Sequence, residues 1–523
     1  MKKLKKNQKS NVIYIGSTSW LTIQDCKLIS KHQCFVKIRK KTFTHMNKSY
    51  EFLKKAIDQR VPIYGINTQF GDQVTLLDEN FEGSSKEYYE SIENRQKALI
   101  NSHCCGLGDV VLIDFVRVAM ILRAHCLSQG YSGVKYSAVN ALVSFYNHDI
   151  NPIVRQFGSI GASGDLIPLA SIATAIIGGN TEVVYRGKII KATQALKLTG
   201  LQKYNPQIRE GLAMINGTTF MTAIAALAVY ELKRLFDQML TAIALSLESL
   251  KVIDCAYHPL VHEVKRHKGE IEVNNFVLAC WRGSQLITNI NEARSKLERP
   301  IQDYYSLRSV SQGFGPFFEN LDRSINWIEN EINSVNDNPI IDLDNAKIHH
   351  GANFMGYYIT DACDLLKMNI AQAATWIHAL LAVMVHPRKN NALPANLVKD
   401  PSNQNGFRPL QLLAASITVQ CRKLAQCHQS YMLPTEGDNQ DVNSLGTHAA
   451  FDLQNAVTYL DKLTAILYLA VAQALELRGI EKISDTGKKI LASIRKVSPT
   501  IGKCRPLTNE LNNVVMMLRE EKI

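Results

Sequence analysis

Three small residues, Ala162, Ser163 and Gly164, lie in a glycine-rich stretch whose composition permits an unusual modification of the backbone. Gly164 has no side chain, so its amide nitrogen can approach the carbonyl carbon of Ala162 in a strained turn. Closure of a five-membered ring with loss of water would turn Ser163 into a dehydroalanine, an electrophile made from the chain itself. A helix that starts near Asp165 would direct its N-terminal dipole at this turn. Taken alone, the tripeptide also fits a helix entry that carries no chemistry.

Other motifs give this tripeptide a context. The stretch GSIGASGDLIPLA is joined, in chain order, by YGINT at 64–68, GLAMINGT at 211–218, YSLR at 305–308, NDNP at 336–339, GANF at 351–354 and NQDVNS at 439–444. Together they resemble the signatures of the aromatic amino-acid lyase family, which contains histidine, phenylalanine and tyrosine ammonia-lyases and related aminomutases. The resemblance spans about residues 60–480. It implies a methylidene-imidazolone (MIO) group formed autocatalytically from Ala162, Ser163 and Gly164, with no external cofactor.

The resemblance also implies residue roles that make physical sense. A tyrosinate at Tyr64, on a flexible glycine loop, can take the weakly acidic β-proton and be shielded from water when the loop closes. Arg308 can hold the substrate carboxylate with two hydrogen bonds. Tyr305 assists elimination or the MIO environment, and Asp165 assists ring closure. The substrate-binding residues are then Ser102, His103, Asn216, Gln302, Arg308, Asn338, Phe354 and Gln440.

Each of these residues also has a reading without catalysis. Tyr64 fits an aromatic plug in a loop, and Arg308 fits a buried structural ion pair. His103 fits a buried structural histidine, and Phe354 fits plain core packing. The amides of Asn216, Gln302 and Asn338 can serve the MIO oxygen or the polar end of the substrate.

Two positions bear on the choice of substrate. The pair Ser102-His103 resembles that of histidine lyases and of one bacterial group of tyrosine lyases. Histidine lyases carry a glutamate where this chain has Gln440, so we expect no carboxylate there to hold an imidazolium. His103 could instead hydrogen-bond a phenolic hydroxyl. The sequence thus favours tyrosine, giving 4-coumarate, with histidine or phenylalanine as alternatives.

Three positions depart from the family pattern. Gln69 stands where the family usually has glycine, which could stiffen the lid or reach into the pocket. Ser309 and Ser311 replace the usual Cys and Pro after the YSLR motif. These changes affect fine positioning rather than the class of reaction.

Hydrophobic periodicity indicates which elements must position these residues. Apolar residues at three- and four-residue steps predict helices over 87–100, 110–127, 137–148, 219–250, 316–334, 353–385, 408–430 and 447–477. Val12–Ile15 is a strand candidate, and Val183–Ile190 resembles a hairpin. The chain is expected to be mainly α, with a long central helical bundle that is fumarase/aspartase-like by the resemblance. We expect a basic disordered tail (1–11), a mixed MIO-bearing domain (12–215), a bundle domain (216–480) and a C-terminal helical segment (481–523).

Composition excludes several classes. The 523 residues carry a net charge of +12, but five lysines of the first ten residues supply much of it, and no nucleic-acid motif accompanies it. No signal-peptide core or long apolar run predicts a membrane span. Eleven scattered cysteines predict free thiols in a cytoplasmic protein. His258 and His262, with Glu263 and His267, read HExxxH rather than HExxH, so no metal site is expected.

Two further alternatives stay open. An aminomutase would return the same ammonia to the β-carbon and needs only slower product release. A retired scaffold would keep the assembly without activity, but the intact Ala162-Ser163-Gly164, Tyr64 and Arg308 argue against it. The resemblance implies a homotetramer whose active sites take residues from several subunits, and long apolar helices need such partners to cover their faces.

Overall fold

The computed structural model describes residues 11–74, 84–291 and 300–522. Residues 1–10, most of the expected basic tail, lie outside this part. The chain divides into two compact units. Unit 1 comprises residues 1–230, 325–363 and 427–451, and unit 2 comprises residues 231–324, 364–426 and 452–523. The expected four-part domain division stays a prediction.

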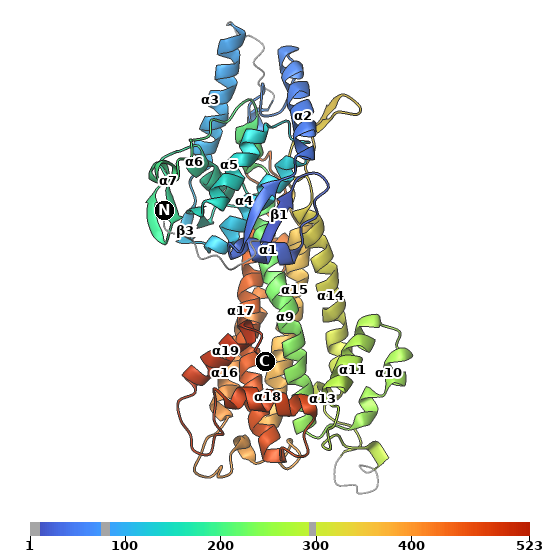
Figure 1. The fold of residues 1–523 in the computed structure, drawn as a ribbon. Coiled ribbons are helices and arrows are strands. Elements are labelled where there is room, and N and C mark those ends of the chain that lie inside the picture. Colours follow the sequence, from blue (N-terminus) through green and yellow to red (C-terminus); the bar gives the residue numbers. More distant parts are fainter. Residues whose placement is uncertain (1–10, 75–83, 292–299, 523) are drawn as a thin grey trace. The chain divides into compact units, whose positions relative to one another are not determined.

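Unit 1 mixes helices with short strands (Figure 1). Its helices are α1 (Ile23–Ser30), α2 (Lys41–Asp58), α3 (Ser85–His103), α4 (Ile113–Ser128), α5 (Tyr136–Asn147), α6 (Leu166–Ile176), α7 (Ala192–Thr199) and α8 (Glu210–Ile215). Its strands are β1 (Asn11–Ile15), β2 (Cys34–Ile38), β3 (Leu107–Val110), β4 (Ile150–Pro152), β5 (Arg155–Phe157), β6 (Glu182–Tyr185), β7 (Lys188–Lys191), β8 (Ile340–Asp342) and β9 (Lys347–His349).

The strands of unit 1 form small separate sheets. β1 and β2 pair in parallel, whereas β3–β5, β4–β6–β7 and β8–β9 are antiparallel. The turn Arg186-Gly187 joins β6 to β7, which confirms the expected hairpin. Each of the described sheets has only two or three strands, so helices supply most of the buried side chains of unit 1.

Unit 2 is helical over its described residues. Its own helices are α10 (Pro259–Glu263), α11 (Lys268–Cys280), α13 (Tyr305–Arg308), α16 (Arg408–Leu424), α18 (Asp485–Arg495) and α19 (Thr508–Arg519). Four longer helices contribute residues to both units: α9 (Thr219–Ser249), α14 (Val310–Ile332), α15 (Tyr357–Val385) and α17 (Gly446–Arg478). These agree with the helices predicted from hydrophobic periodicity, which confirms a mainly α fold.

Within unit 2 the long helices run alongside one another (Figure 1), and their facing side chains are largely buried and apolar. The buried Tyr468 hydroxyl on α17 donates to the backbone carbonyl of Gln238 on α9 at 2.7 Å. Ala242–Leu245 of α9 is buried all round, which is typical of an inner helix. The Thr418 hydroxyl of α16 donates to the carbonyl of Ala374 on α15 at 3.3 Å. The α15 helix is long and apolar enough to cross a membrane, but 61% of its most apolar stretch is buried within the protein.

Candidate active site

The Ala-Ser-Gly turn lies between β5 and α6 and has a backbone that requires glycine at two points. Gly161 and Gly164 both have positive φ, at +68° and +69°. Gly164 forms an isolated parallel bridge with Gly217, and the amide of Asp165 donates to the Gly217 carbonyl at 2.8 Å. A Cβ built on Gly164 would lie 2.3 Å from the Gly217 oxygen. No residue other than glycine fits at position 164 without moving the backbone behind it.

Asn216 holds the serine of this turn. It ends the short helix α8 as its C-cap, and it is buried. Its Nδ2 donates to the Ser163 carbonyl at 3.1 Å and to Ser163 Oγ at 3.0 Å. Its Oδ1 is buried without a hydrogen-bond partner among the described residues. A buried, unpartnered amide oxygen costs stability, so its position favours a functional role.

Asp165 connects the turn to the N-terminus of α9. This fully buried carboxylate accepts hydrogen bonds from the amides of Phe220 and Met221 at 3.1 and 2.8 Å. It also accepts from the hydroxyls of Ser159, at 2.8 Å, and Thr447. Burial raises the pKa of Asp165 to about 6, while these hydrogen bonds oppose the rise. The turn is therefore fixed on its helix side by a carboxyl group that titrates close to neutral pH.

Tyr64 lies in a loop that two buried amide side chains tie down. The Tyr64 hydroxyl accepts from the Gly71 amide at 3.3 Å, and burial raises the pKa of this phenol. Gln96 on α3 donates to the Gly65 carbonyl at 2.8 Å and accepts from the Leu212 amide at 2.9 Å. Asn67 accepts from the Ile63 amide and donates to the Val61 carbonyl, both at 2.7 Å.

A cavity of about 280 Å³ brings several expected site residues together. Its walls include Tyr64, Ala162, Ser163, Asn338, Phe354 and Gln440 from that set. Its other lining residues are Gly71, Val74, Met355, Asn439, Asp441 and Val442. No arginine or lysine stands among these described lining residues. Asn216 and Asp165 support the wall from behind, through the contacts given above.

Two carboxylates lie close to Gln440: Asp441 lines the cavity, and Glu436 contacts Gln440 without lining the cavity itself. The Gln440 amide donates to Glu436 Oε2 at 2.9 Å and accepts from the Thr435 hydroxyl at 2.9 Å. A Cβ built on Gly71 would lie 2.9 Å from the same Glu436 oxygen. The Glu436 charge adds to the effect of burial in raising the pKa of Tyr64.

Sequence reasoning missed Glu436. The motif match began only at Asn439, and no periodic pattern marks a loop residue three positions earlier. The sequence offered only one signal, the spacing of four residues between Glu436 and Gln440. The structure shows why this spacing matters: a tight turn between Thr435 and Gln440 brings the intervening side chains close together.

Ser102 and His103 end α3 and are not among the lining residues of this cavity. His103 Nδ1 lies 2.9 Å from the Leu99 carbonyl and 3.3 Å from the Ser102 hydroxyl. A carbonyl oxygen can only accept, so Nδ1 carries the proton and Nε2 of the neutral ring is an acceptor. His103 is half-buried rather than fully buried, so the structural reading of a buried histidine does not describe it.

Gln302, Tyr305 and Arg308 belong to unit 2, whereas the cavity above belongs to unit 1. Tyr305 is 75% exposed, and the Arg308 guanidinium lies 4.7 Å from the centre of its ring. Arg308 Nε is buried without a hydrogen-bond partner among the described residues. The α13 helix that carries both is fixed by Trp376, whose indole N–H donates to the Ser306 carbonyl at 2.9 Å.

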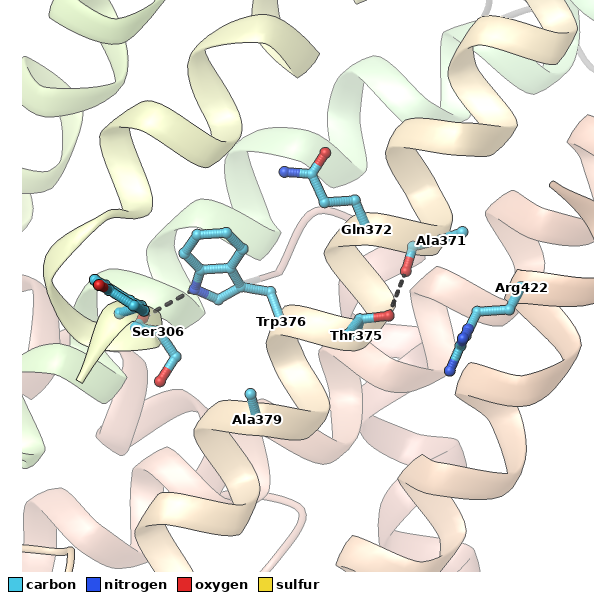
Figure 2. A pocket seen from close by; sticks show the side chains of 8 residues that line it. Ser306, Ala371, Gln372, Thr375, Trp376, Ala379 and Arg422 are labelled. Atoms are coloured by element: carbon cyan, nitrogen blue, oxygen red, sulfur yellow. Dashed lines mark hydrogen bonds between the residues drawn. The ribbon is translucent and has the colours of Figure 1, made fainter.

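The α13 helix borders an apolar cavity of about 410 Å³. Figure 2 shows Trp376 and Thr375 on α15 and Arg422 on α16 around this cavity, which Tyr305 also lines.

The histidine stretch after α9 forms ordinary structural contacts. His262 is buried, with Nδ1 2.8 Å from Glu270 and Nε2 3.2 Å from the Ala256 carbonyl. His258 Nδ1 caps α10 by accepting from the Leu260 amide at 3.3 Å. Across residues 11–74, 84–291 and 300–522, no three His, Cys, Asp or Glu side chains cluster in a way that could hold a metal.

The fold places the chain in a known structural class. It superposes on tyrosine aminomutase from Streptomyces globisporus with a TM-score of 0.90, 26% identity and coverage of 98% of this chain and 97% of the other. It superposes equally well on phenylalanine aminomutase of Pantoea agglomerans, with a TM-score of 0.90, 27% identity and coverage of 96% and 98%. The class is that of helical enzymes acting on carbon–nitrogen bonds of amino acids.

Within this class the sequence identifies the family. Residues 21–496 match the family described as aromatic amino acid lyase, and the chain belongs to it. Histidine ammonia-lyase of Geobacillus thermodenitrificans is 34% identical over 478 residues, which cover 91% of this chain and 92% of that protein. The expected family and the expected class of carbon–nitrogen lyase are thereby confirmed.

Proposed function

We propose that this chain eliminates ammonia from an aromatic L-amino acid, using an MIO group formed from Ala162, Ser163 and Gly164. The observation that carries the proposal is the glycine-only geometry of Gly164, with Ser163 facing the cavity that Tyr64 lines. The residues present fit the group, since the unpartnered Asn216 Oδ1 and the open space at Ser163 accept a ring in place of the linear turn. When formed, the group supplies an electrophile for the substrate amine.

Formation of the group balances without an oxidant. The Gly164 nitrogen bonds to the Ala162 carbonyl carbon, whose oxygen leaves as water with the amide protons of Ser163 and Gly164. The Ser163 hydroxyl then leaves with the Ser163 Cα proton as a second water, and a Cα–Cβ double bond forms. The buried Asp165 carboxyl, with its pKa of about 6, is suited to accept and return protons in these steps.

Tyr64 is proposed as the base for the β-proton. Burial and the Glu436 charge both raise the pKa of this phenol, so its anion is a strong base. Gly71 donates to the same oxygen and can stabilise that anion. The two amide clamps from Gln96 and Asn67 keep the loop backbone in place, which supports a fixed position for the phenol oxygen.

A carboxylate-binding cation has to come from elsewhere, because the described lining of the cavity holds no arginine or lysine. We propose Arg308 for this task, with Tyr305 and Gln302, supplied by another copy of the chain in a homotetramer. Two observations support this: Tyr305 is exposed, and Arg308 Nε is buried without a partner. The buried Arg308 Nε has given up water without gaining a hydrogen-bond partner among the described residues, which is unfavourable unless another group joins it.

Tyrosine is the substrate we favour, because the Ser102-His103 pair resembles that of one group of tyrosine lyases. His103 does not line the cavity described above, so we propose that the end of α3 completes the ring pocket in the assembled protein, where Nε2 suits a phenolic hydroxyl. Histidine is the second candidate, and a specific observation favours it. Glu436 and Asp441 put carboxylates at the cavity edge, which suit an imidazolium, and the Geobacillus relative is named for histidine. No disulfide joins any of the eleven cysteines, all of which lie in the described residues, and this supports a location in the reducing cytoplasm.

The decisive assay is incubation of the chain with tyrosine, histidine and phenylalanine separately. Ultraviolet absorbance follows the arylacrylate, and chromatography detects β-amino acids. A lyase gives arylacrylate and free ammonia, whereas an aminomutase gives mainly the β-amino acid. If none of the three substrates yields either product, the proposed function is wrong.

A further inference from the structure

Arg123 and Asn336 occupy the space where a side chain of Gly217 would lie. Gly217 has a φ of +156°, and a Cβ built on it would lie 2.2 Å from Nη1 of Arg123. The same Cβ would lie 2.5 Å from Oδ1 of Asn336 and 2.6 Å from its carbonyl oxygen. These are distances that real Cβ atoms do not show, so Arg123 and Asn336 leave no free volume behind this peptide.

Gly217 is itself in close contact with the tripeptide on its other side. A Cβ on Gly164 would lie 2.3 to 2.6 Å from three backbone atoms of Gly217. The Gly217 backbone therefore contacts the Gly164 backbone, while the Arg123 guanidinium occupies the place where a side chain of Gly217 would lie. The Asp165 amide donates a hydrogen bond to the Gly217 carbonyl at 2.8 Å. This bond keeps the two backbone segments from sliding past each other.

Arg123 makes its hydrogen bonds beside Gly217 rather than to the carboxylate of Asp337. It is fully buried on α4, and its Nε donates to the Ala213 carbonyl at 2.6 Å. Nη1 donates to Asn336 Oδ1 at 3.0 Å, while Nη2 lies 3.4 Å from Asp337 and makes no hydrogen bond. Ala213 and Gly217 lie four residues apart, and the Arg123 guanidinium contacts the backbone at both positions.

We infer that Arg123 and Asn336 form a rigid support that holds Gly217 against Gly164 and so keeps the Gly164 nitrogen close to the Ala162 carbonyl carbon. Both are positioning residues for ring closure, because they touch Gly217 and not the reacting atoms. The inference rests on the proposed function, in which the Gly164 nitrogen forms the new bond to Ala162. Small displacements matter here, since a misplacement of about 1 Å can slow a positioned reaction roughly a hundredfold.

Arg209 offers a matched control. It is also fully buried and also pairs with Asp337, through Nη1 at 2.8 Å and Nη2 at 2.9 Å. Its other bonds go to the carbonyls of Ser132 and Asn338, and its atoms are not among the three nearest to a Cβ built on Gly217. Arg209→Lys therefore disturbs the same buried ion pair without disturbing the support behind Gly217.

The test follows the mass of the full chain during cell-free synthesis of wild type, Arg123→Lys, Asn336→Ala and Arg209→Lys. Formation of the MIO group removes the mass of two waters, one at ring closure and one at dehydration of Ser163, and this readout does not depend on turnover. Circular dichroism and thermal unfolding report on folding of each variant. We expect Arg123→Lys and Asn336→Ala to lose the two waters roughly tenfold more slowly than wild type, and Arg209→Lys to match wild type. Asn336→Ala removes no charge, so it serves if Arg123→Lys does not fold.

The outcomes separate the two claims. Wild-type rates in the folded Arg123 or Asn336 variant would overturn the inference, and so would an equal slowing in Arg209→Lys. If both support variants failed to fold while Arg209→Lys folded, Arg123 and Asn336 would be structural residues and the inference would be wrong. A wild-type chain of unreduced mass would contradict the proposed function itself.

Discussion

At the scale of single residues, His103 gives the sharpest prediction on substrate choice. The proton on Nδ1 is bonded to the Leu99 carbonyl, which leaves Nε2 to accept from a phenol. Removing the His103 imidazole would leave the hydroxyl of a bound tyrosine without a partner and cost about 1–3 kcal/mol of transition-state stabilisation for tyrosine. It would have little effect on phenylalanine, which has no hydroxyl. His103→Phe should therefore shift the tyrosine-to-phenylalanine ratio of kcat/KM toward phenylalanine by roughly tenfold or more.

The rival substrate predicts a different result for the same variant. If histidine is the best wild-type substrate and His103→Phe abolishes its turnover, the carboxylates of Glu436 and Asp441 determine the ring preference. An unchanged tyrosine-to-phenylalanine ratio would exclude His103 from substrate recognition. Measuring three substrates on two proteins covers these outcomes.

Asp165 predicts a pH dependence of stability. Its folded pKa is raised from 3.8 to about 6 by burial, so the folded chain binds the proton more tightly than the unfolded chain. The stability from this group is complete below pH 3.8 and is lost as pH rises through 6, amounting to roughly 3 kcal/mol. Asn lacks this titration, so Asp165→Asn should gain in thermal midpoint relative to wild type between pH 4.5 and pH 7. A difference in midpoint that does not change with pH would refute this assignment.

The residue scale also shows the limits of sequence reasoning. The turn residues and Tyr64 were predictable because short motifs carry them. Glu436 was not, because its relation to Gln440 depends on a tight turn and on the packing of Gly71 against it. The same contact places a carboxylate beside Gln440, although position 440 itself carries none.

At the scale of elements, Gln96 links α3 to the Tyr64 loop and to α8. Gln96→Ala leaves the Gly65 carbonyl and the Leu212 amide unpaired, with a loss of about 1–3 kcal/mol in stability. The loosened loop should also lower kcat by roughly tenfold. Gln129→Ala is the control, since Gln129 donates to the carbonyls of Asn333 and Ser334 and does not touch this loop. If both variants lower kcat equally, Gln96 has no special role in positioning Tyr64.

Element prediction succeeded where the pattern was long. The helices α9, α14, α15 and α17 carry apolar periodicity over many turns, and the β6–β7 hairpin has a clear turn at Arg186-Gly187. The strands β4, β5, β8 and β9 were not predicted, because each has three residues, too few to show an alternating pattern. Their existence depends on pairing with distant segments.

At the scale of the whole molecule, chain order does not map onto compact units. The four longest helices contribute to both units, so each unit collects three separate segments of the chain. Boundaries drawn along the sequence cannot express this arrangement. Tyr305 and Arg308 were selected because the YSLR motif contains them. Their relation to the cavity depends on the assembly that we propose.

Complementation tests the shared active site. Tyr64→Phe and Arg308→Ala should each be inactive alone. If Tyr64 and Arg308 of one site come from different copies, co-expression restores about a quarter of the wild-type activity, because that share of randomly assembled sites receives both intact residues. If one copy supplies both residues, every mixed site keeps a defect and no activity returns. Size-exclusion chromatography confirms that the two variants assemble together.

The central claim is that Ser163 becomes part of the electrophile that removes ammonia from an aromatic amino acid. Its most direct test is ammonia release from tyrosine, histidine and phenylalanine by wild type and by Ser163→Ala. Alanine has no hydroxyl to lose, so the methylidene cannot form, while the fold is expected to remain. We predict ammonia from wild type with at least one of the three substrates and none above background from the variant. Equal ammonia release by Ser163→Ala would contradict the account.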